Sequence, residues 1–339
     1  MRTLAGSPVG SVVRIRGTDH RFGEAYDVEA FLPAALPRSL TLPTSTWSML
    51  TEAAAELGRL DAAAALIPNP QLVTRVATRR EAIGTSALEG TFAALTELFA
   101  AEALPLDQQG KGVPANVREV MNYTRAADRA ASWVQDRPIT AGLLSELQRE
   151  IVRGTASDGE EAGDIRTTQV FIGARNRRIR EARFIPSPPG DQLRMLFDDW
   201  LSWVQVPPER SEMPLLVQVA LAHYQFETIH PYHDGNGRLG RLIVVLQLMR
   251  SGALRAPVLS VSPWLKDHAE RYRDHLLEIS HSGDWAPWVE FFAEAIAVQA
   301  RDGHDRIMQL LALSKELGER VRADLPKARL AVEIADSLI

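Results

Sequence analysis

The feature that most constrains the fold is a pair of apolar helical stretches joined by a short polar segment. Upstream, Met213–Ile229 carries apolar residues at helical spacing, and Pro231 disfavours helical geometry at His230, so a mostly buried helix should end at this histidine. Downstream, Leu239–Met249 predicts a second buried helix. The sequence therefore places His230 at the end of a core helix, facing a loop.

The loop between these helices has the composition of an anion site with a base beside it. Gly235-Asn236-Gly237 can aim successive backbone amides at one point just before a helix N-terminus, an arrangement that binds phosphate. Arg238 and Arg241 are three residues apart, so both lie on one face of that helix, and guanidinium groups suit phosphate oxygens. Asp234 supplies a hard oxygen ligand for Mg²⁺, and His230 is the candidate base.

Residues His230–Arg241, HPYHDGNGRLGR, resemble the Fic family signature HxFx(D/E)GNGRxxR, with Tyr232 in place of the usual Phe. The likeness continues in Arg80–Thr91, which is similar to the N-terminal inhibitory helix motif (S/T)xxxE(G/N) of some members. It also includes a flap region between Gly163 and Pro188 and a closing helix near Gly283–Phe292. In all, the resemblance covers about residues 26–300.

The expected fold is all-α, with a Fic-type helical core, one β-hairpin flap and an N-terminal helical region. The strands of the flap are expected at Thr168–Ile172 and Arg183–Ile185, whereas residues 1–43, which Pro33, Pro37 and Pro43 punctuate, are expected to be irregular. The expected division is an N-terminal region with the inhibitory helix (1–110), a Fic catalytic core (111–300) and a C-terminal helical segment (301–339). Ala328–Ile339 is either the first helix of a winged helix cut short at Ile339 or a packing helix.

The resemblance implies an autoinhibited protein adenylyltransferase, a nucleotidyltransferase that moves AMP from MgATP to a Ser, Thr or Tyr hydroxyl of a target protein and releases pyrophosphate. His230 would take the hydroxyl proton, Asp234 would hold Mg²⁺, and Tyr272 would lie near adenine, although the family's usual Tyr-Tyr pair is Tyr272-Arg273 here. The residues implied to hold the phosphates are Gly235, Asn236, Gly237, Arg238 for the β-phosphate and Arg241 for the γ-phosphate. The flap residues implied to bind an extended target segment by strand addition are Thr168, Gln169, Val170, Phe171 and Ile172.

Glu89 is a second residue for which the sequence indicates a specific role. Asn69-Pro70 indicates a helix start and Gly90 a helix end, so Glu89 would sit at a helix C-terminus, where its charge opposes the dipole and requires a cationic partner. By resemblance, that partner is Arg241, the ion pair blocks the γ-phosphate position, and Thr85 anchors the helix.

The composition of the chain argues against several classes of protein. The absence of cysteine rules out a disulfide scaffold, and a net charge of -5 argues against nucleic acid as a partner. With neither a signal peptide nor a membrane-length apolar run, a cytoplasmic protein without membrane contact is expected. A homodimer remains open.

Three alternatives to the interpretation as a transferase also remain open. The first is an enzyme that removes AMP, or does both reactions, with Glu89 positioning a water. The second is a nucleotide-sensing regulatory protein with a DNA-binding extension. The third is a metal-dependent hydrolase with a ligand cluster of His223, His230, His233 and Asp234, which Pro231 disfavours because the helix ends there.

Overall fold

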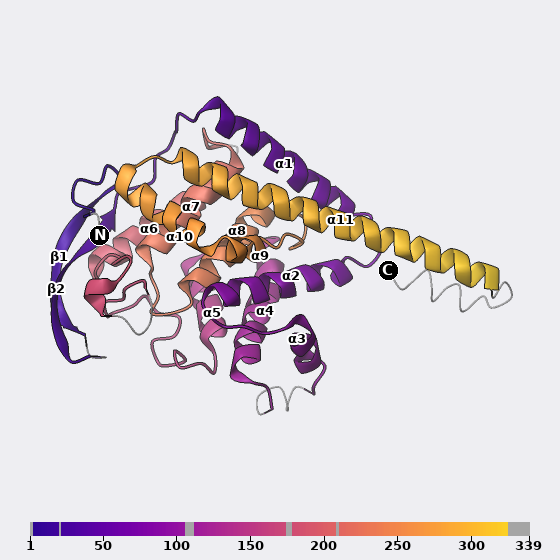
Figure 1. Cartoon of the computed structure of the whole chain (residues 1–339), viewed down its shortest axis with the longest axis horizontal. Helices are drawn as coiled ribbons and strands as arrows, with labels where there is room; N and C mark the ends of the chain where they lie inside the picture. Colours follow the sequence, from indigo (N-terminus) through magenta and orange to yellow (C-terminus); the bar gives the residue numbers. More distant parts are fainter. Residues whose placement is uncertain (1–2, 20–21, 106–111, 174–177, 208–209, 325–339) are drawn as a thin grey trace.

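The chain folds into a helical body flanked by one small β-hairpin (Figure 1). The structure is a computed structural model and describes residues 3–19, 22–105, 112–173, 178–207 and 210–324. The predicted all-α class is confirmed, because helices dominate these residues and their one sheet has two strands. In order, the elements are β1 (Gly10–Asp19), β2 (Glu24–Pro33), α1 (Thr44–Ala64), α2 (Pro70–Leu88), α3 (Leu95–Glu102), α4 (Ala115–Val134), α5 (Ala141–Val152), η1 (Ile179–Glu181), α6 (Asp191–Val204), α7 (Leu215–Ile229), α8 (Asn236–Arg250), α9 (Ser262–Asp267), α10 (Ala269–Ser282) and α11 (Ala286–Asp324).

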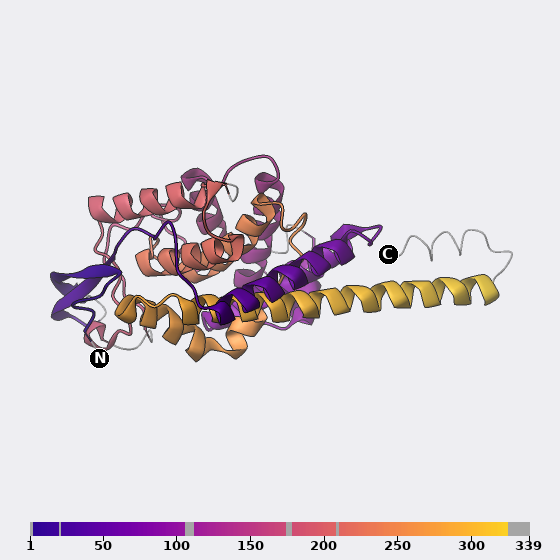
Figure 2. The ribbon, with the colours of Figure 1, turned by 90° about the horizontal axis from the view of Figure 1, so that it is seen from above.

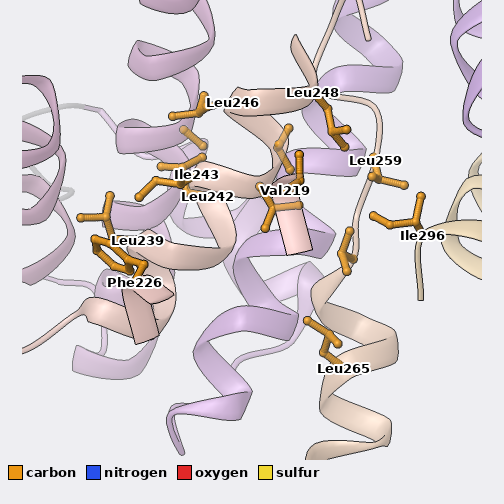
Figure 3. Close-up of a cluster of buried hydrophobic side chains, with 14 of the residues drawn as sticks. Val219, Phe226, Leu239, Leu242, Ile243, Leu246, Leu248, Leu259, Leu265 and Ile296 are labelled. Carbon is orange, nitrogen blue, oxygen red and sulfur yellow. The ribbon is translucent and has the colours of Figure 1, made fainter. Parts of the chain in front are cut away.

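Helices α7 and α8 form the centre of the core, as their apolar composition predicts. Every residue of α8 from Asn236 to Met249 is buried, and so are thirteen residues of α7. Figure 3 shows Phe226 of α7 beside Leu239 of α8, within a larger apolar cluster. The other helices cover this pair: α4 and α5 pack on α8, and α6 and α11 pack on α7. The loop between α7 and α8 is therefore held at a fixed place by two buried helices.

Helix α1 lies parallel to the first half of α11, although the two are far apart in sequence (Figures 1 and 2). Arg301 of α11 bonds Glu52 of α1 at 2.8 Å, and Thr46 bonds Glu290 at 2.6 Å. The second half of α11 then continues past the body as a long arm. This helix runs to Asp324.

The N-terminal segment is not irregular, so that expectation is wrong. Strands β1 and β2 pair antiparallel along ten residues each, from Gly10 opposite Pro33 to Asp19 opposite Glu24. The exposed Arg14 and Arg16 alternate with the partly buried Ile15, which is the period-two signal of a strand with one face covered. The prolines of this segment favour irregular structure, but Pro33 lies at the last position of its strand, where it is tolerated.

The flap differs from the expected regular hairpin. Its two segments meet at a single bridge, in which Ile172 and Phe184 exchange backbone hydrogen bonds of 2.8 and 3.2 Å. The flap backbone bonds to other groups as well: the Phe31 amide of β2 donates to the Ile185 carbonyl at 2.9 Å. Residues 174–177, at the turn, lie outside the described part, as does Ala328–Ile339, the predicted start of a winged helix.

None of the helices in the described ranges combines the length and the apolar run needed to cross a bilayer.

Candidate active site

The backbone at His230 is unusual. This residue ends α7 in the left-handed conformation, at φ 51° and ψ 62°, and is the one non-glycine residue with a positive φ in the described chain. Its amide still bonds to the Phe226 carbonyl at 2.9 Å, and Pro231 follows. A side chain in this strained conformation leaves the helix axis sharply, and such strain persists only where surrounding contacts enforce it.

Arg166 provides that enforcement. Its Nε donates to the His230 carbonyl at 2.8 Å, its other nitrogens donate to the carbonyls of Thr168 at 3.1 Å and Ser187 at 2.5 Å, and its own amide donates to Pro231 at 3.0 Å. The side chain is almost fully buried, and burial lowers the pKa of Arg166 to about 10, so the guanidinium stays charged at neutral pH. The sequence marks this residue only by its likeness to the flap region, because its partners are backbone carbonyls that no residue type reveals.

The imidazole of His230 is prepared to accept a proton. Its Nδ1 lies 3.3 Å from the Glu227 carbonyl, which can only accept, so Nδ1 carries the hydrogen and Nε2 keeps its lone pair. Burial, followed by the charge of Arg166, lowers the pKa of His230 to about 4 against smaller opposing effects of the Glu227 carbonyl, Glu89 and Asp234. The ring is therefore neutral at pH 7, as a general base requires.

The start of α8 forms the predicted anion loop. Gly235 has φ 77°, a conformation that glycine adopts without strain, and the next residues begin the helix with their amides unpaired by helical bonds. The side chain of Asn236, by contrast, holds the loop: it accepts from the Tyr232 amide at 2.9 Å and donates to the Tyr232 carbonyl at 2.7 Å. The expected phosphate contact of Asn236 stays a prediction, and the second Nδ2 hydrogen is the part of this side chain that could still make it.

Asp234 and Arg238 lie together at the mouth of this loop. Asp234 accepts from the Ser157 hydroxyl at 2.7 Å and from the Gly235 amide at 2.6 Å. Arg238 is 3.5 Å from Asp234 and 3.4 Å from Glu119, and its Nε has no partner among the described groups. One accessible carboxylate beside a hydroxyl suits Mg²⁺, which keeps most of its ligands as water and phosphate.

The hydrolase cluster is not assembled. His223 is buried in the core, where its Nδ1 lies 3.2 Å from the Gly240 carbonyl and its Nε2 lies 2.7 Å from the Tyr272 hydroxyl. His233 lies on the other side of the loop, 3.4 Å from the Thr168 hydroxyl. Within the described ranges, no three His, Asp or Glu side chains are grouped closely enough to hold a metal ion.

Glu89 and Arg241 form the predicted ion pair at 2.6 Å. The buried Arg241 also donates to the Thr85 hydroxyl at 2.6 Å and to the Thr85 carbonyl at 3.2 Å, which fixes both ends of the guanidinium to the last turn of α2. Burial alone would raise the pKa of Glu89, but Arg241, with help from Arg238 and His230, lowers it below its ordinary value. The carboxylate is therefore charged at neutral pH.

The Glu89 carboxylate lies directly over the anion loop. A Cβ atom placed on Gly237 would overlap Glu89 Oε1 and would crowd the guanidinium of Arg241 at 3.0 Å. Glycine is required at this position to admit the carboxylate, and the space that Glu89 fills is in front of the loop amides. An anion bound by the start of α8 would have to compete with Glu89 for Arg241.

Helix α2 is anchored along its length. Glu81 is fully buried and accepts hydrogen bonds from the Ser262 amide at 2.8 Å and from the Ser262 hydroxyl. One turn later, a Cβ on Gly84 would lie 2.7 Å from the Pro263 nitrogen, so α2 touches the start of α9 backbone to backbone. At the helix end, Arg273 donates to the Leu88 carbonyl at 3.3 Å. Arg273 stands where the family's second tyrosine is usual, and it caps the C-terminus of the helix instead.

A cavity of about 140 Å³ connects these groups. Its walls include the end of α2, the flap residues Ile172 and Phe184, and the last turn of α7 with His230. Tyr272 of α10 lines it, as expected for a residue near a nucleoside, although its hydroxyl is occupied by His223. Ile172 thus faces the cavity, in contrast to the rest of the flap edge.

A second groove follows the flap edge on the other side. It is lined by residues 168–171 of the flap, by His233 and Asp234 of the loop after α7, and by Thr18 and Tyr26 of the N-terminal hairpin. The flap edge expected to bind a target therefore opens next to the predicted metal ligand. The hairpin contribution was missed because its strands were not recognised.

Comparisons with known proteins identify the family of this chain. The Fic/DOC family N-terminal model matches residues 47–132, and the Fic/DOC family model matches residues 138–248. The chain therefore belongs to the Fic family.

Named relatives make the relationship more specific. The chain is 35% identical over 164 residues to protein adenylyltransferase Fic of Drosophila grimshawi, a match covering 48% of this chain and 30% of the relative. It is 32% identical over 200 residues to the enzyme of the same name from Drosophila erecta, covering 56% and 36%. The matched region thus spans about a third of these relatives.

Solved structures show the same fold. A Fic family protein from Desulfovibrio desulfuricans G20 aligns with a TM-score of 0.64 at 25% identity, over 84% of this chain and 82% of that one. Fic-1 from C. elegans aligns with a TM-score of 0.57 at 20% identity, over 80% and 74%.

Proposed function

We propose that this protein is an autoinhibited adenylyltransferase that moves AMP from MgATP to a hydroxyl side chain of a target protein. The observation that carries the proposal is the position of three groups: a neutral His230 at the end of α7, the anion loop at the start of α8, and a carboxylate of the same chain in front of that loop. The names of the curated relatives support the same activity.

In the proposed reaction, His230 Nε2 takes the proton from the target hydroxyl. The hydroxyl oxygen then bonds to the α-phosphorus of ATP, the bond from that phosphorus to the bridging oxygen of the β-phosphate breaks, and pyrophosphate leaves with the electron pair. Reactions of this kind depend mainly on positioning and charge stabilisation. The unpaired amides at the start of α8 and the guanidinium of Arg238 provide both for the α- and β-phosphates.

Asp234 is the residue that would hold Mg²⁺, with the Ser157 hydroxyl and Glu119 near it. A bound Mg²⁺ neutralises phosphate charge and orients the phosphate chain. The carboxylate is preorganised for this task, since the Gly235 amide and the Ser157 hydroxyl fix its two oxygens.

Glu89 would keep the enzyme inactive by occupying Arg241. The γ-phosphate needs this guanidinium, and both cannot bind it in the same place because Glu89 Oε1 is already 2.6 Å away. An advantage of a few kcal/mol suffices, since each 1.4 kcal/mol changes the productive fraction about tenfold.

For the target, we propose an extended segment that adds as a strand along residues 168–171 of the flap. The lining of the groove beside this edge includes Asp234, so a hydroxyl presented there would lie near the proposed metal ligand.

One experiment tests the activity and its inhibition together. Wild-type protein, Glu89→Gly, Glu89→Gly/His230→Ala and Glu89→Gly/Arg241→Ala are each incubated with α-labelled ATP, Mg²⁺ and cell lysate, and label on protein is measured. Glu89→Gly is expected to raise labelling at least about tenfold. The added His230→Ala should lower it by about 10² to 10⁴ while nucleotide binding persists. Adding Arg241→Ala should remove the gain. Equal labelling in Glu89→Gly and the His230→Ala double variant would refute the role of the histidine.

The position of Glu89 also suits the reverse reaction. A carboxylate over the anion loop, close enough to His230 to affect its pKa, can hold a water in front of a phosphorus. Incubation of wild type and Glu89→Gly with AMP-modified target decides this point. Release of AMP by wild type but not by the variant would show removal of AMP as a second activity.

A further inference from the structure

Glu227 is a partly buried carboxylate for which the reaction proposed above has no use. It lies on the last turn of α7, three residues before His230, and lines the same cavity as Glu89 and Arg241. Its Oε1 atom is shielded from solvent and has no hydrogen-bond partner among the described groups. An acceptor left in this state costs free energy, so its retention in the cavity calls for an explanation.

Helix α8 leaves a space for this carboxylate. A Cβ atom on Gly240 would lie 2.7 Å from Glu227 Oε1 and 3.1 Å from the ring of Phe226, so a residue with a side chain does not fit there. One turn earlier, Gly237 leaves the equivalent space for Glu89. The two glycines thus admit two carboxylates to one face of α8, and Arg241, the residue after Gly240, lies beside both.

Titratable groups from α8, α2 and α10, and from its own helix, surround Glu227. Arg241 faces it from α8, Glu89 from α2 and Tyr272 from α10, and His223 and His230 belong to its own helix and cap. Burial raises the pKa of Glu227 to about 7; Arg241 opposes this rise and Glu89 adds to it. The carboxyl group is therefore poised to change its charge near neutral pH when a neighbouring charge is added or removed.

Charge balance changes in each state of the site. In the closed state Glu89 compensates Arg241 at 2.6 Å. When Glu89 withdraws, Glu227 is the remaining carboxylate of the described cavity wall, and a buried guanidinium without any counter-charge would be costly. A γ-phosphate then brings about two negative charges to Arg241, which disfavours a second anion there.

We propose that Glu227 is a resident counter-charge for Arg241, which takes up a proton from solvent when a terminal phosphate binds that arginine. The inference rests on the proposed function, since it needs a γ-phosphate at Arg241. No covalent bond changes in this step: the proton moves from solvent to a Glu227 oxygen as the nucleotide binds and returns when the nucleotide leaves.

Two consequences follow for binding. Nucleoside triphosphates should bind more tightly as pH falls through the neutral range, because the protonated form of Glu227 accepts the γ-phosphate without repulsion. Nucleoside diphosphates should lack this dependence, because they bring no terminal phosphate to Arg241.

The test uses the full chain carrying Glu89→Gly, with the α,β-methylene analogue of ATP and Mg²⁺ as the probe, since this analogue cannot transfer AMP. Calorimetric titrations at pH 7.5 in two buffers of different ionisation enthalpy measure the protons taken up. We expect at least about 0.3 proton per bound triphosphate, and no uptake with the diphosphate analogue. In Glu89→Gly/Glu227→Gln the uptake should vanish, and at pH 8 the triphosphate should bind about tenfold more tightly.

The outcomes separate the two proposals. If the analogue fails to bind Glu89→Gly at all, the proposed function is wrong. If it binds with no proton uptake, or with the same uptake after Glu227→Gln, the role of Glu227 is overturned and the proposed function stands. Should Glu227→Gln fold poorly, Glu227→Met removes the same charge with an unbranched side chain of similar length and gives the same comparison.

Discussion

Two buried histidines show how single residues with the same pKa behaviour take different roles. Burial keeps both His223 and His230 neutral, with pKa values lowered to about 3 and about 4. His223 uses both ring nitrogens, on the Gly240 carbonyl and the Tyr272 hydroxyl, so it can only support the core. His230 uses one nitrogen and leaves the other facing a cavity. The free nitrogen separates a candidate base from a core residue.

The neutral state of His223 makes folding sensitive to acid. Its pKa in the folded protein, about 3, lies below the ordinary value of 6.5, so between these values the unfolded chain binds a proton that the native chain does not. Stability from this residue is complete above pH 6.5 and is lost as pH falls. We expect it to account for about 2 kcal/mol of the decrease in unfolding free energy between pH 7 and pH 5.

Urea unfolding of wild type and His223→Gln at pH 7 and pH 5 measures this contribution of His223 to the unfolding free energy. The decrease on acidification should be about 2 kcal/mol smaller in the variant. An identical decrease in the two proteins would mean that His223 is protonated in the native state.

Asp234 is expected to act through its charge. In the Glu89→Gly background, Asp234→Asn keeps an oxygen for the Gly235 amide and offers an amide N–H to the Ser157 hydroxyl, but it loses the charge that attracts Mg²⁺. The Mg²⁺ concentration for half-maximal transfer should rise at least about tenfold. Ser157→Ala should raise it less, because it keeps the charge and removes only the hydroxyl that fixes one Asp234 oxygen. A normal Mg²⁺ requirement in Asp234→Asn would remove Asp234 from the metal site.

At the scale of elements, the middle of α2 is fixed by buried contacts, and its last turn is the part that is expected to move. Glu81 binds Ser262 and Gly84 touches Pro263, so the middle of the helix cannot shift without breaking buried contacts. Glu89 is followed by Gly90 at φ 90°, where the chain turns freely. Release of Arg241 is therefore expected to involve the last turn of α2, from Thr85 to Gly90, while the rest of the helix stays in place.

A methyl group at the contact of α2 with α9 tests this arrangement. Gly84→Ala places a Cβ 2.7 Å from the Pro263 nitrogen, so α2 must move away, which should cost about 1–3 kcal/mol and raise basal labelling with α-labelled ATP. Gly58→Ala is the control, since a Cβ at this exposed position of α1 meets nothing within 4 Å. It should add about 0.5–1 kcal/mol to stability and leave labelling unchanged. A loss of stability in Gly84→Ala with no gain in labelling would show that the position of α2 does not control the activity.

The sequence predicts those elements whose ends carry a chemical signal. Asn69-Pro70 and Gly90 bracket α2 as expected, and Pro231 ends α7 at His230 as expected. The pairing of Glu89 with Arg241 was implied by the resemblance of the two motifs to the Fic family, because the position of Glu89 at a helix end indicates only that it needs a cationic partner. The roles of Arg166 and Asn236 could not be predicted, because both bind backbone groups that are the same in every residue. The pairing of β1 with β2 could not be predicted, because the alternation around Ile15 is brief and the prolines at positions 33, 37 and 43 favour irregular structure after it.

At the scale of the molecule, the N-terminal hairpin braces the flap across about 150 positions of sequence. The Phe31 amide bonds to the Ile185 carbonyl at 2.9 Å, and the Phe31 ring meets Phe184 edge-on with centroids 5.8 Å apart. Phe184 in turn bridges to Ile172. The wall of the cavity and the edge of the target groove therefore depend on a segment outside both family matches.

Removing the Phe31 ring should loosen the flap and leave the inhibitory contact intact. Phe31→Ala is expected to cost about 3 kcal/mol and to speed hydrogen exchange at the Ile172 and Phe184 amides. Exchange in the last turn of α2 should not change. Phe22→Ala serves as the control because that ring is 40% exposed at the other end of the hairpin. Unchanged exchange at Ile172 in Phe31→Ala would show that the flap is held independently of the hairpin.

Because Glu89 and Arg241 belong to one chain, the glutamate would act in the proposed function as a tethered competitor of ATP. Its effective concentration is set by the short distance from the anchored part of α2 and stays the same whether the protein is dilute or concentrated. Raising ATP can shift the balance only as far as the nucleotide outcompetes that local concentration, whereas a partner that pulls on the last turn of α2 removes the competitor altogether. Control of such an enzyme is therefore exerted more effectively on the tether than on the supply of substrate.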